Sequence, residues 1–553
     1  MASADLVFTG GTVRVSGRRT AQAVAVRGNR IAAAGGSAEI AELIGQRTEI
    51  VELAGRAVLP GFVDAHVHPT HGGMSLIRCD LRGAESATEA VGRVARYAGE
   101  HPDQQWITGG GWELSWFAGG VPHRSLLDAV VPDRPVYLPN RDAHGAWVNS
   151  RALERSGVDA STPDPADGRI ERDPDGSPQG TLHEGATRLV ADRMPAPTFD
   201  DRVAALLAGQ AHLHSMGVTG WQDAIVGDYL GWLDPLDVYL ATAESGRLTG
   251  RVVGALWWDR DRGGEQIDDL LARREGAGGP DGTGRFRATS VKIMQDGIAE
   301  NFTAGMVTPY LDVDGHGGGT GSSYVAPGAL RGYAATLDAA GFQLHFHAIG
   351  DRAIRESLDA IAACRDANGH TDTRPHIAHL QIIQPVDVPR FGSLGVAATM
   401  QALWAYHEPQ MDDLTIPFLG PERTEWQYPF GSLQASGAHL AAGSDWPVTT
   451  ANPFRALQVA VTRLPPPGEG TGAEEPFLPV QRLDLATAFD AYTIGSAYVN
   501  HADQETGSIE AGKLADLVVV DRDPFAGPDG DIGSVRVLGT YVDGVPVFTD
   551  PAW

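Results

Sequence analysis

Apolar segments of strand length recur eight times between residues 57 and 445, and amphipathic stretches lie between several of them. The strand-like segments are 57–68, 218–224, 251–258, 288–294, 342–348, 374–381, 395–402 and 439–445. Stretches with helical periodicity are 200–216, 326–340, 353–367 and 424–436. Repeated βα units favour a sheet that closes on itself, with the helices outside. We therefore predict an α/β chain built on a (β/α)8 TIM-type barrel.

The two ends of the chain differ from its middle in the pattern of their apolar and turn-forming residues. Residues 1–57 and 505–553 alternate short β-type runs with turn signals. We expect both ends to form one small β-sandwich, and residues 58–504 to form the barrel. Within the first βα unit, a segment at about 70–195 is rich in Gly, Pro and Trp and is too long for a plain loop. It is expected to be a cap inserted after strand one.

Charge and cysteine content narrow the choice of partners and compartment. The net charge of −27 disfavours nucleic acid and anionic membrane surfaces as partners. Cys79 and Cys364 are the only cysteines, which excludes a disulfide framework and fits a reducing compartment. No apolar run reaches the length of a membrane span, and the start lacks the pattern of a signal peptide. We expect a soluble cytoplasmic protein, and whether it forms a homo-oligomer stays open.

Lysine is almost absent from this chain, since only Lys292 and Lys513 occur among its 43 basic residues. Lys292 lies at the end of the segment 288–294. A buried amine can lose its proton and react, for example with carbon dioxide to give a carbamate, whereas a guanidinium stays charged. Taken alone, Lys292 is better explained by a bias towards arginine that left two lysines. Its position at the end of a predicted barrel strand favours the chemical explanation.

Histidine and aspartate close four of the other predicted strands. His66 and His68 are two apart, so on a strand they share a face. His347, His379 and Asp445 each end an apolar segment, and the carboxyl ends of barrel strands converge on one rim. For any one of these histidines a hydrogen-bonded core role is the simpler explanation, but the whole set indicates a metal site. Nitrogen and oxygen ligands without cysteine suit zinc, and also manganese, iron or nickel.

The order His-x-His, Lys, His, His, Asp resembles the amidohydrolase superfamily of metal-dependent hydrolases. Four motifs are similar to the branch that includes N-substituted formamide deformylases, amidohydrolase family 3. They are Pro-Gly-Phe-Val-Asp-Ala-His-Val-His, Val-Lys-Ile-Met-Gln-Asp-Gly, His-Ala-Ile-Gly-Asp-Arg-Ala and Gly-Ser-Asp-Trp-Pro-Val. The likeness extends to Asp142-Ala-His144-Gly-Ala-Trp147 in the cap and covers almost the whole chain. The sequence departs from the family pattern at the end of the sixth predicted strand. It reads His-Ile-Ala-His there, whereas members of the family often read Arg-Ile-Glu-His.

This resemblance implies a ligand set and a reaction. His66, His68 and Asp445 would hold one divalent metal, His347 and His379 a second, and carboxylated Lys292 would bridge them, with one or two zinc ions per chain expected. A metal-activated hydroxide would cleave a non-peptide carbon–nitrogen bond of an amide or N-substituted formamide. Asp445 would pass the water's proton to the leaving nitrogen. The likeness assigns His347 as the ligand, and His345 would lie on the same face one layer deeper.

Substrate contacts are expected from Trp112, His144 and Gln401, and the substrate is expected to be a small molecule with an apolar group. The cap tryptophans Trp112, Trp116 and Trp147 would equally suit the packing of a cap core. By contrast, His71, His183 and His407 are interpreted as ordinary polar residues.

Two other functions stay open. One is a non-hydrolytic metal-dependent barrel enzyme such as a decarboxylase, and the other is a catalytically idle binding or regulatory protein. A serine hydrolase is disfavoured because the chain has no Gly-x-Ser-x-Gly elbow. A Walker-type phosphate loop is disfavoured because leucine follows Lys513.

Overall fold

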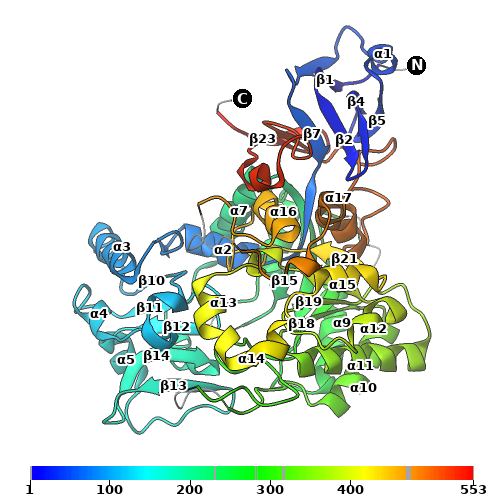
Figure 1. Cartoon of the computed structure of the whole chain (residues 1–553). Coiled ribbons are helices and arrows are strands. Elements are labelled where there is room, and N and C mark those ends of the chain that lie inside the picture. The colour runs from blue at the N-terminus through cyan, green and yellow to red at the C-terminus, as the bar shows by residue number, and fades with distance from the viewer. Residues whose placement is uncertain are drawn as a thin grey trace.

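An eight-stranded parallel sheet forms the centre of the molecule, with strand order β21-β20-β19-β18-β17-β16-β15-β8 and helices on its outer side (Figure 1). The computed structural model describes residues 3–229, 232–279, 282, 284–313, 318–468, 475–551 and 553. The barrel strands are β8 (Phe62–Val67), β15 (Val218–Val226), β16 (Arg251–Trp257), β17 (Phe286–Met294), β18 (Gln343–Ala348), β19 (His376–His379), β20 (Ala397–Met400) and β21 (His439–Ala442). The predicted TIM-type barrel is confirmed, since each strand overlaps one predicted segment.

The first and last barrel strands meet along a seam rather than a regular ladder. The backbone N–H of Asp445 donates to the carbonyl of His66 at 2.8 Å, and that of His68 donates to Trp446 at 2.9 Å. Glycine is needed beside this seam because a Cβ at Gly443 would lie 2.7 Å from the Cβ of His66. Two residues predicted as metal ligands, His66 on β8 and His68 just after it, therefore lie directly against Asp445.

The first predicted strand, 57–68, is divided between two sheets, which corrects the prediction of one continuous strand. β7 (Ala57–Pro60) pairs with β2 (Thr12–Ser16) and β22 (Leu517–Val520) outside the barrel. The division falls at Gly61, where a Cβ would lie 2.3 Å from Thr219 Oγ1. The chain thus passes from the outer sheet into the barrel in a single residue.

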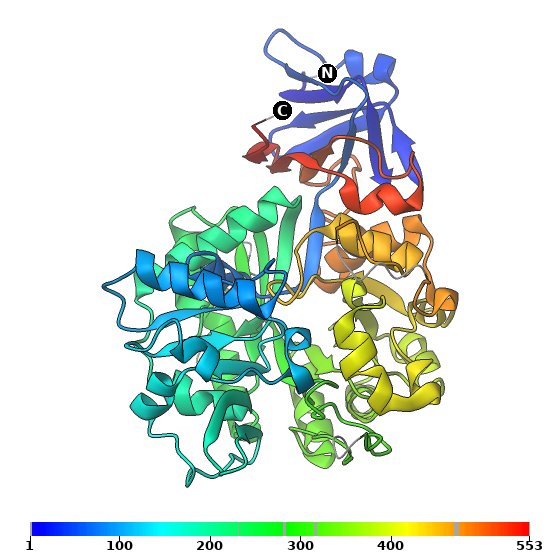
Figure 2. The same cartoon turned by 60° about the vertical axis from the view of Figure 1, so that its left-hand side comes forward.

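Two further sheets are built from the chain ends, and they form a separate lobe that carries both termini (Figures 1 and 2). One has the order β5-β4-β1-β6 and the other β24-β23-β22-β7-β2-β3. Their other strands are β1 (Leu6–Thr9), β3 (Arg19–Ala21), β4 (Ala23–Arg27), β5 (Arg30–Gly35), β6 (Glu49–Glu52), β23 (Val537–Val542) and β24 (Val545–Thr549). Side chains from both ends, such as Phe8, Val24 and Val519, share one apolar cluster. The domain boundaries at residues 57 and 505 stay predictions.

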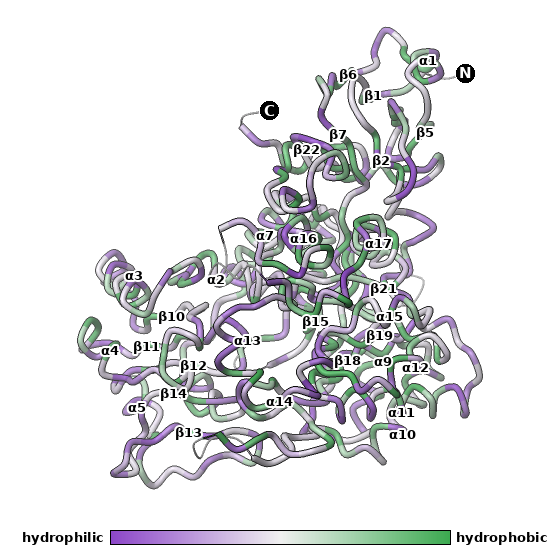
Figure 3. The backbone as a smooth tube through the Cα atoms, in the orientation of Figure 1, coloured by the Kyte–Doolittle hydropathy of each residue, from purple (hydrophilic) through white to green (hydrophobic). Residues whose placement is uncertain are grey.

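The segment after strand one forms a third sheet with the order β13-β14-β12-β11-β10-β9. Its elements are β9 (Cys79–Asp80), α3 (Ala87–Glu100), β10 (Ile107–Gly110), α4 (Ser125–Asp128), β11 (Val136–Pro139), β12 (Gly145–Val148), α5 (Ser150–Ser156), β13 (Gly168–Arg172), β14 (Pro178–Glu184) and α6 (Arg188–Ala191). Figure 3 shows β13, at the outer edge of this sheet, mostly hydrophilic, as suits an exposed edge strand.

Three of the four predicted helices are confirmed as α7 (Phe199–Ser215), α10 (Pro327–Ala339) and α11 (Asp351–Asn368). The fourth prediction, 424–436, is wrong in its first half, because α14 (Ile416–Thr424) ends there and α15 (Phe430–Ala435) begins after Pro429. Between them the Tyr428 N–H bonds to the carbonyl of Gln381 at 2.8 Å instead of continuing a helix.

The remaining helices are α1 (Ser37–Ala41), α2 (Pro69–Leu76), α8 (Leu236–Glu244), α9 (Ile267–Gly276), α12 (Val388–Leu394), α13 (Pro409–Leu414), α16 (Pro453–Thr462), α17 (Leu485–Asp490) and α18 (Ser496–Val499). Within the described residues, none of the helices combines the length and apolarity that crossing a bilayer requires.

Candidate metal centre

Six side chains predicted as metal ligands line one cavity at the carboxyl ends of the barrel strands. They come from five places in the barrel: His66 and His68 from the end of β8, Lys292 from β17, His347 from β18, His379 from β19 and Asp445 from the loop after β21. All are buried except His68, whose side chain is 11% exposed. The parallel sheet brings them together because its strands all end at the same rim.

Asp445 lies at the middle of this group. Its Oδ1 is 3.0 Å from His68 Nε2 and 3.3 Å from His66 Nε2, and its Oδ2 is 3.8 Å from His379 Nδ1. Lys292 Nζ lies 3.4 Å from His66 Nε2. Donor atoms of His66, His379 and Asp445 all lie within 4.8 Å of one another. The ring centroids of His347 and His379 are 4.4 Å apart, so His347 borders the same group.

His379 provides a test of whether a metal fits here. Its side chain is 2% exposed, and neither ring nitrogen has a hydrogen-bond partner within the described part of the chain. Burying an imidazole without hydrogen bonds is costly, and such groups in native proteins usually have an explanation such as a bound ion. Because the neighbouring donors are imidazole nitrogens and a carboxylate, the residues fit a divalent metal.

Burial sets the protonation of the centre. It lowers the pKa of Lys292 to about 7, against the attraction of Asp445 and Asp223, so much of the amine is uncharged at neutral pH. Burial also lowers the pKa of His66, His347 and His379 well below its usual value. These imidazoles are therefore neutral, which is the form that binds metal.

His345 lies one layer below the ligands rather than among them. Its Nε2 is 2.8 Å from His66 Nδ1, and its ring packs against His376 with centroids 3.9 Å apart. His376 in turn lies 2.9 Å from Gln222 Oε1, and Gln222 donates to Gln343. This polar column runs down the barrel interior and holds the His66 ring from behind, leaving its Nε2 for the cavity.

The cap contributes His144 to the wall of the cavity. Its Nδ1 lies 3.0 Å from Glu184 Oε1, and its ring centroid lies 5.7 Å from that of His347. Burial opposes a charge on this ring, but the Glu184 carboxylate raises the pKa of His144 to about 9. Glu184 is buried and has a φ of 50°, a strained backbone for a residue with a side chain.

Trp112 and Gln401, both expected to contact substrate, lie outside the residues that line this cavity. Trp112 donates to the carbonyl of Leu138 at 2.7 Å and packs against Trp147 in the core of the cap. Gln401 accepts a hydrogen bond from the backbone N–H of His379 at 2.6 Å, so it holds the ligand strand. Neither side chain lines this cavity, and their contact with a substrate stays a prediction.

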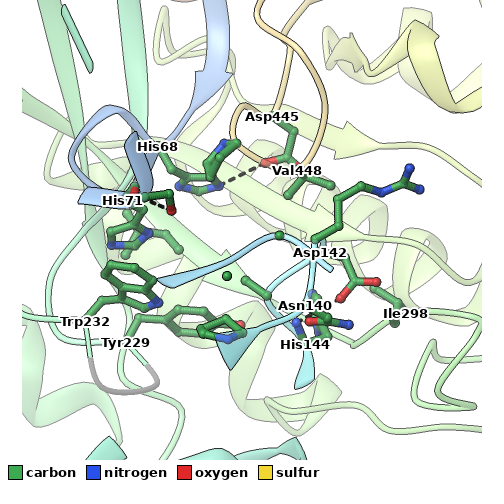
Figure 4. A pocket seen from close by; sticks show the side chains of 18 of the residues that line it. His68, His71, Asn140, Asp142, His144, Tyr229, Trp232, Ile298, Asp445 and Val448 are labelled. Carbon is green, nitrogen blue, oxygen red and sulfur yellow. Dashed lines mark hydrogen bonds and ion pairs between the residues drawn. The ribbon is translucent and has the colours of Figure 1, made fainter. Parts of the chain in front are cut away.

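An aromatic wall that the sequence did not reveal borders the cavity. It consists of Tyr229, Trp232, Trp257 and Trp404. His71, interpreted as an ordinary polar residue, stacks on Trp232 with centroids 4.5 Å apart, and Figure 4 shows this pair beside Tyr229. The Trp404 ring stacks on His379, which is one of the predicted metal ligands. Tyr229 and Trp232 follow β15, whereas Trp257 is the last residue of β16, so these aromatics share no repeating pattern.

The fold and the site together define a (β/α)8 barrel protein with a histidine, carboxylate and lysine centre on its rim. The model of the amidohydrolase family matches residues 49–548 of the sequence. The chain belongs to the amidohydrolase family, which confirms the resemblance inferred from its motifs.

Relatives and solved structures resemble the chain over nearly its whole length. Protein LONG AFTER FAR-RED 3 of Arabidopsis thaliana is 32% identical, with 99% of this chain and 92% of the relative covered. The N-substituted formamide deformylase of Arthrobacter pascens is 28% identical, with 98% of each covered. A solved structure described as an uncharacterized metal-dependent hydrolase from Pyrococcus horikoshii OT3 has a TM-score of 0.73 at 27% identity, covering 95% of this chain and 99% of its own.

Proposed function

We propose that the protein is a metal-dependent hydrolase that cleaves a non-peptide carbon–nitrogen bond in a small amide or N-substituted formamide. The observation that carries this proposal is the convergence of six potential ligands on one rim, where neither nitrogen of buried His379 has a hydrogen-bond partner among the described residues. The relative named N-substituted formamide deformylase supports the type of bond. The aromatic wall supports a substrate with an apolar group.

His66, His68 and Asp445 would hold one ion, and His347 and His379 a second, with zinc the expected metal. Divalent ions, when bound, polarise a carbonyl group and lower the pKa of water. The protein's part is to keep the imidazoles of His66, His347 and His379 neutral and the carboxylate ionised. Burial alone would raise the pKa of Asp445, but the hydrogen bond from His68 and the nearby His379 lower it below its usual value.

Lys292 would join the two halves of the ligand set as a carbamate. Its uncharged Nζ adds to the carbon of carbon dioxide and releases one proton, which leaves a carbamate with a negative charge shared by two oxygens. The lowered pKa of the amine supports this step because the uncharged form is the nucleophile. Asp223, the other carboxyl group acting on Lys292, lies on β15 and is hydrogen-bonded to Tyr239 at 2.7 Å.

Asp445 would transfer the proton. The attacking water loses a proton to the Asp445 carboxylate as its oxygen bonds to the carbonyl carbon. Asp445 then gives that proton to the leaving nitrogen as the carbon–nitrogen bond breaks, so the amine departs neutral. His144, held by Glu184 above the rim, would contact the substrate from the cap.

Metal content and turnover should be measured together to test the proposal. N-benzylformamide, acetanilide and an ester analogue would be offered to the protein as purified, with zinc, manganese, iron and nickel quantified. We expect stoichiometric transition metal and release of amine, and loss of turnover in Asp445→Asn. Active protein without transition metal would contradict the proposal.

Lys292→Ala separates hydrolysis from the alternative of a single-metal decarboxylase. The hydrolase proposed here should lose both metal and activity in this variant, whereas a decarboxylase that needs no carbamate should keep both. Full cellular function of a metal-free Asp445→Asn variant would instead favour a binding or regulatory protein.

A further inference from the structure

A tight hairpin loop in the cap, residues 140–145, joins β11 to β12 over the barrel rim. The backbone N–H of Asn140 donates to the carbonyl of Gly145 at 3.0 Å, and Ala143 has a φ of 61°. The N–H of Arg141 donates to the carbonyl of Trp112 at 2.8 Å, which ties the hairpin to the cap core. Backbone bonds therefore fix the course of the loop.

Asn140 and Asp142 each use one polar side-chain atom for a hydrogen bond within the hairpin and leave the other without a partner. Asn140 Oδ1 accepts from the Gly145 N–H at 2.9 Å, and its Nδ2 has no partner. Asp142 Oδ1 accepts from the His144 N–H at 3.1 Å, and its Oδ2 has no partner. His144 uses Nδ1 for Glu184. These absences are those found within the described part of the chain.

The two remaining atoms are buried, which makes their lack of partners informative. Asn140 is 3% exposed, and the Asp142 Oδ2 atom is likewise out of contact with solvent. Removing a polar atom from water without a compensating hydrogen bond destabilises the protein, so such atoms often mark a ligand's place. Because the anchoring bonds fix each side chain, the hairpin offers one donor and one acceptor in a set arrangement.

Both side chains line the cavity that contains the metal centre. In Figure 4, Asn140, Asp142 and His144 lie on one side, and Trp232 and Tyr229 lie on the other, with His68 and Asp445 above them. The cavity thus has a polar wall and an aromatic wall that are both adjacent to the proposed metals.

We propose that the 140–145 hairpin recognises a second amide-type group of the substrate, separate from the bond that is cleaved. This group is a carboxamide or ureido group, whose N–H donates to Asp142 Oδ2 and whose carbonyl accepts from Asn140 Nδ2. The inference rests on the proposed hydrolase function and specifies its substrate class: an apolar molecule with two amide-like groups.

Other polar groups match this wall less well. A carboxylate or phosphate supplies no donor for Asp142 Oδ2, and the terminal nitrogens of the nearby Arg141 already lie 3.4 Å from Glu113 and 3.6 Å from Glu408. An ammonium group would leave Asn140 Nδ2 without an acceptor. An amide-type group supplies both a donor and an acceptor, which are the partners that Asp142 Oδ2 and Asn140 Nδ2 lack.

Two isosteric probes test this recognition without any need for turnover. Benzylurea carries an aromatic ring and a ureido group, and 4-phenylbutan-2-one has the same shape with CH2 and CH3 in place of NH and NH2. Calorimetric titration of the metal-containing protein should show benzylurea bound about tenfold more tightly, the ratio expected for one hydrogen bond.

Variants that keep the anchoring bonds give distinct signatures. Asp142→Asn turns the free atom from an acceptor into a donor and should bring the two affinities within about twofold of each other. Asn140→Asp removes the donor to the carbonyl, which both probes have, so both should weaken by a similar factor. Asp159→Asn is the matched control. Asp159 lies on the exposed surface of the cap and accepts a hydrogen bond from the Ser161 N–H at 2.8 Å, two residues on, just as Asp142 accepts from the His144 N–H.

Equal binding of the two probes by the wild-type protein would overturn the inference, as would failure to bind either probe. Retention of the tenfold ratio in Asp142→Asn would also overturn it. The proposed function fails on different evidence, namely absent metal and no cleavage of amides, and the affinity ratio can be measured in either case.

Discussion

The low pKa of the Lys292 amine results from its buried position, because an exposed lysine would keep its charge. The residue is 3% exposed, and its amine lies near His66 and is attracted by the carboxylates of Asp445 and Asp223. An arginine there would bring a larger, permanently charged group that cannot form a carbamate.

We expect Lys292→Arg to lose at least one metal ion per chain and to lower kcat/KM at least about 100-fold, the upper end of effects seen when support of a metal site is removed. Elemental analysis and steady-state kinetics measure the two quantities. Lys513→Arg is the control, since the other lysine of the chain donates to the carbonyls of Asp503 and Thr506 far from the rim. Unchanged metal content in Lys292→Arg would contradict a bridging role.

His345 is expected to act through His66. Replacing it with phenylalanine keeps the ring but removes the nitrogen 2.8 Å from His66 Nδ1. The metal dissociation constant should rise about 10- to 100-fold, whereas His345→Gln, which retains an acceptor, should recover most of the affinity. Competition with a chelator gives both constants, and equal affinities for the phenylalanine variant and the wild type would rule out this positioning role.

The ligands could be predicted from the sequence because each closes an apolar strand and matches a motif with fixed spacing. The structure brings all six to one cavity, although their binding of metal stays a prediction. Trp112 could not be placed from sequence, since a tryptophan suits a cap core and a binding wall equally well. Likewise, nothing in the sequence shows that Asn140 Nδ2 lacks a partner, because that depends on how the hairpin folds.

The helices α2 and α7 pack closely together because each has a glycine at the contact, Gly73 on α2 and Gly209 on α7. A Cβ at Gly73 would lie 1.8 Å from the carbonyl oxygen of Ala205, and one at Gly209 would lie 2.2 Å from that of Pro69. Since α2 begins directly after His68, this contact sets where that ligand lies.

We therefore expect Gly73→Ala to lower the free energy of unfolding by about 3 kcal/mol, the upper end for overpacking, and to weaken metal binding. Urea unfolding and metal analysis measure these effects. Gly92→Ala is the matched helical control: no atom lies within 4 Å of its added Cβ, so the helix should be slightly stabilised. Equal stability of the two variants would show that the helices can separate.

The barrel strands were predictable because strands buried on both faces are nearly continuous apolar runs. The division of the first strand was not, since the run continues through Gly61 and only the close approach of Thr219 reveals it. The predicted helix 424–436 failed for a local reason. Its periodicity spans Pro429, but Tyr428 bonds to the end of a barrel strand.

For the molecule as a whole, His214 links stability to pH. His214 lies in the last turn of α7. Its Nδ1 is 2.9 Å from the carbonyl oxygen of Val218, and its Nε2 is 2.8 Å from Thr249 Oγ1. Burial lowers the pKa of this imidazole to about 4. Above about pH 6.5 the imidazole is neutral in both the folded and unfolded states, and no free energy is lost. Below that pH the unfolded chain takes up a proton that the folded protein rejects, so stability falls.

At pH 5 this single group should lower the free energy of unfolding by about 2 kcal/mol relative to pH 7.5. His214→Gln should therefore lose less stability than the wild type over this interval, as measured by urea unfolding at both values. The exposed His370→Gln variant is the control. Parallel pH profiles for wild type and His214→Gln would contradict the assignment.

The seam between β8 and β21 also has a consequence for biosynthesis. His66 and Asp445 face each other across it, so the first and last ligands are separated by most of the polypeptide. A ribosome must translate past residue 445 before the centre can assemble. The outer sheet that contains β7 is completed later still, because its strands β22 to β24 lie near the end of the chain. Nascent chains of this protein therefore emerge with their ligand histidines unshielded, and the complete ligand set can form only late in synthesis.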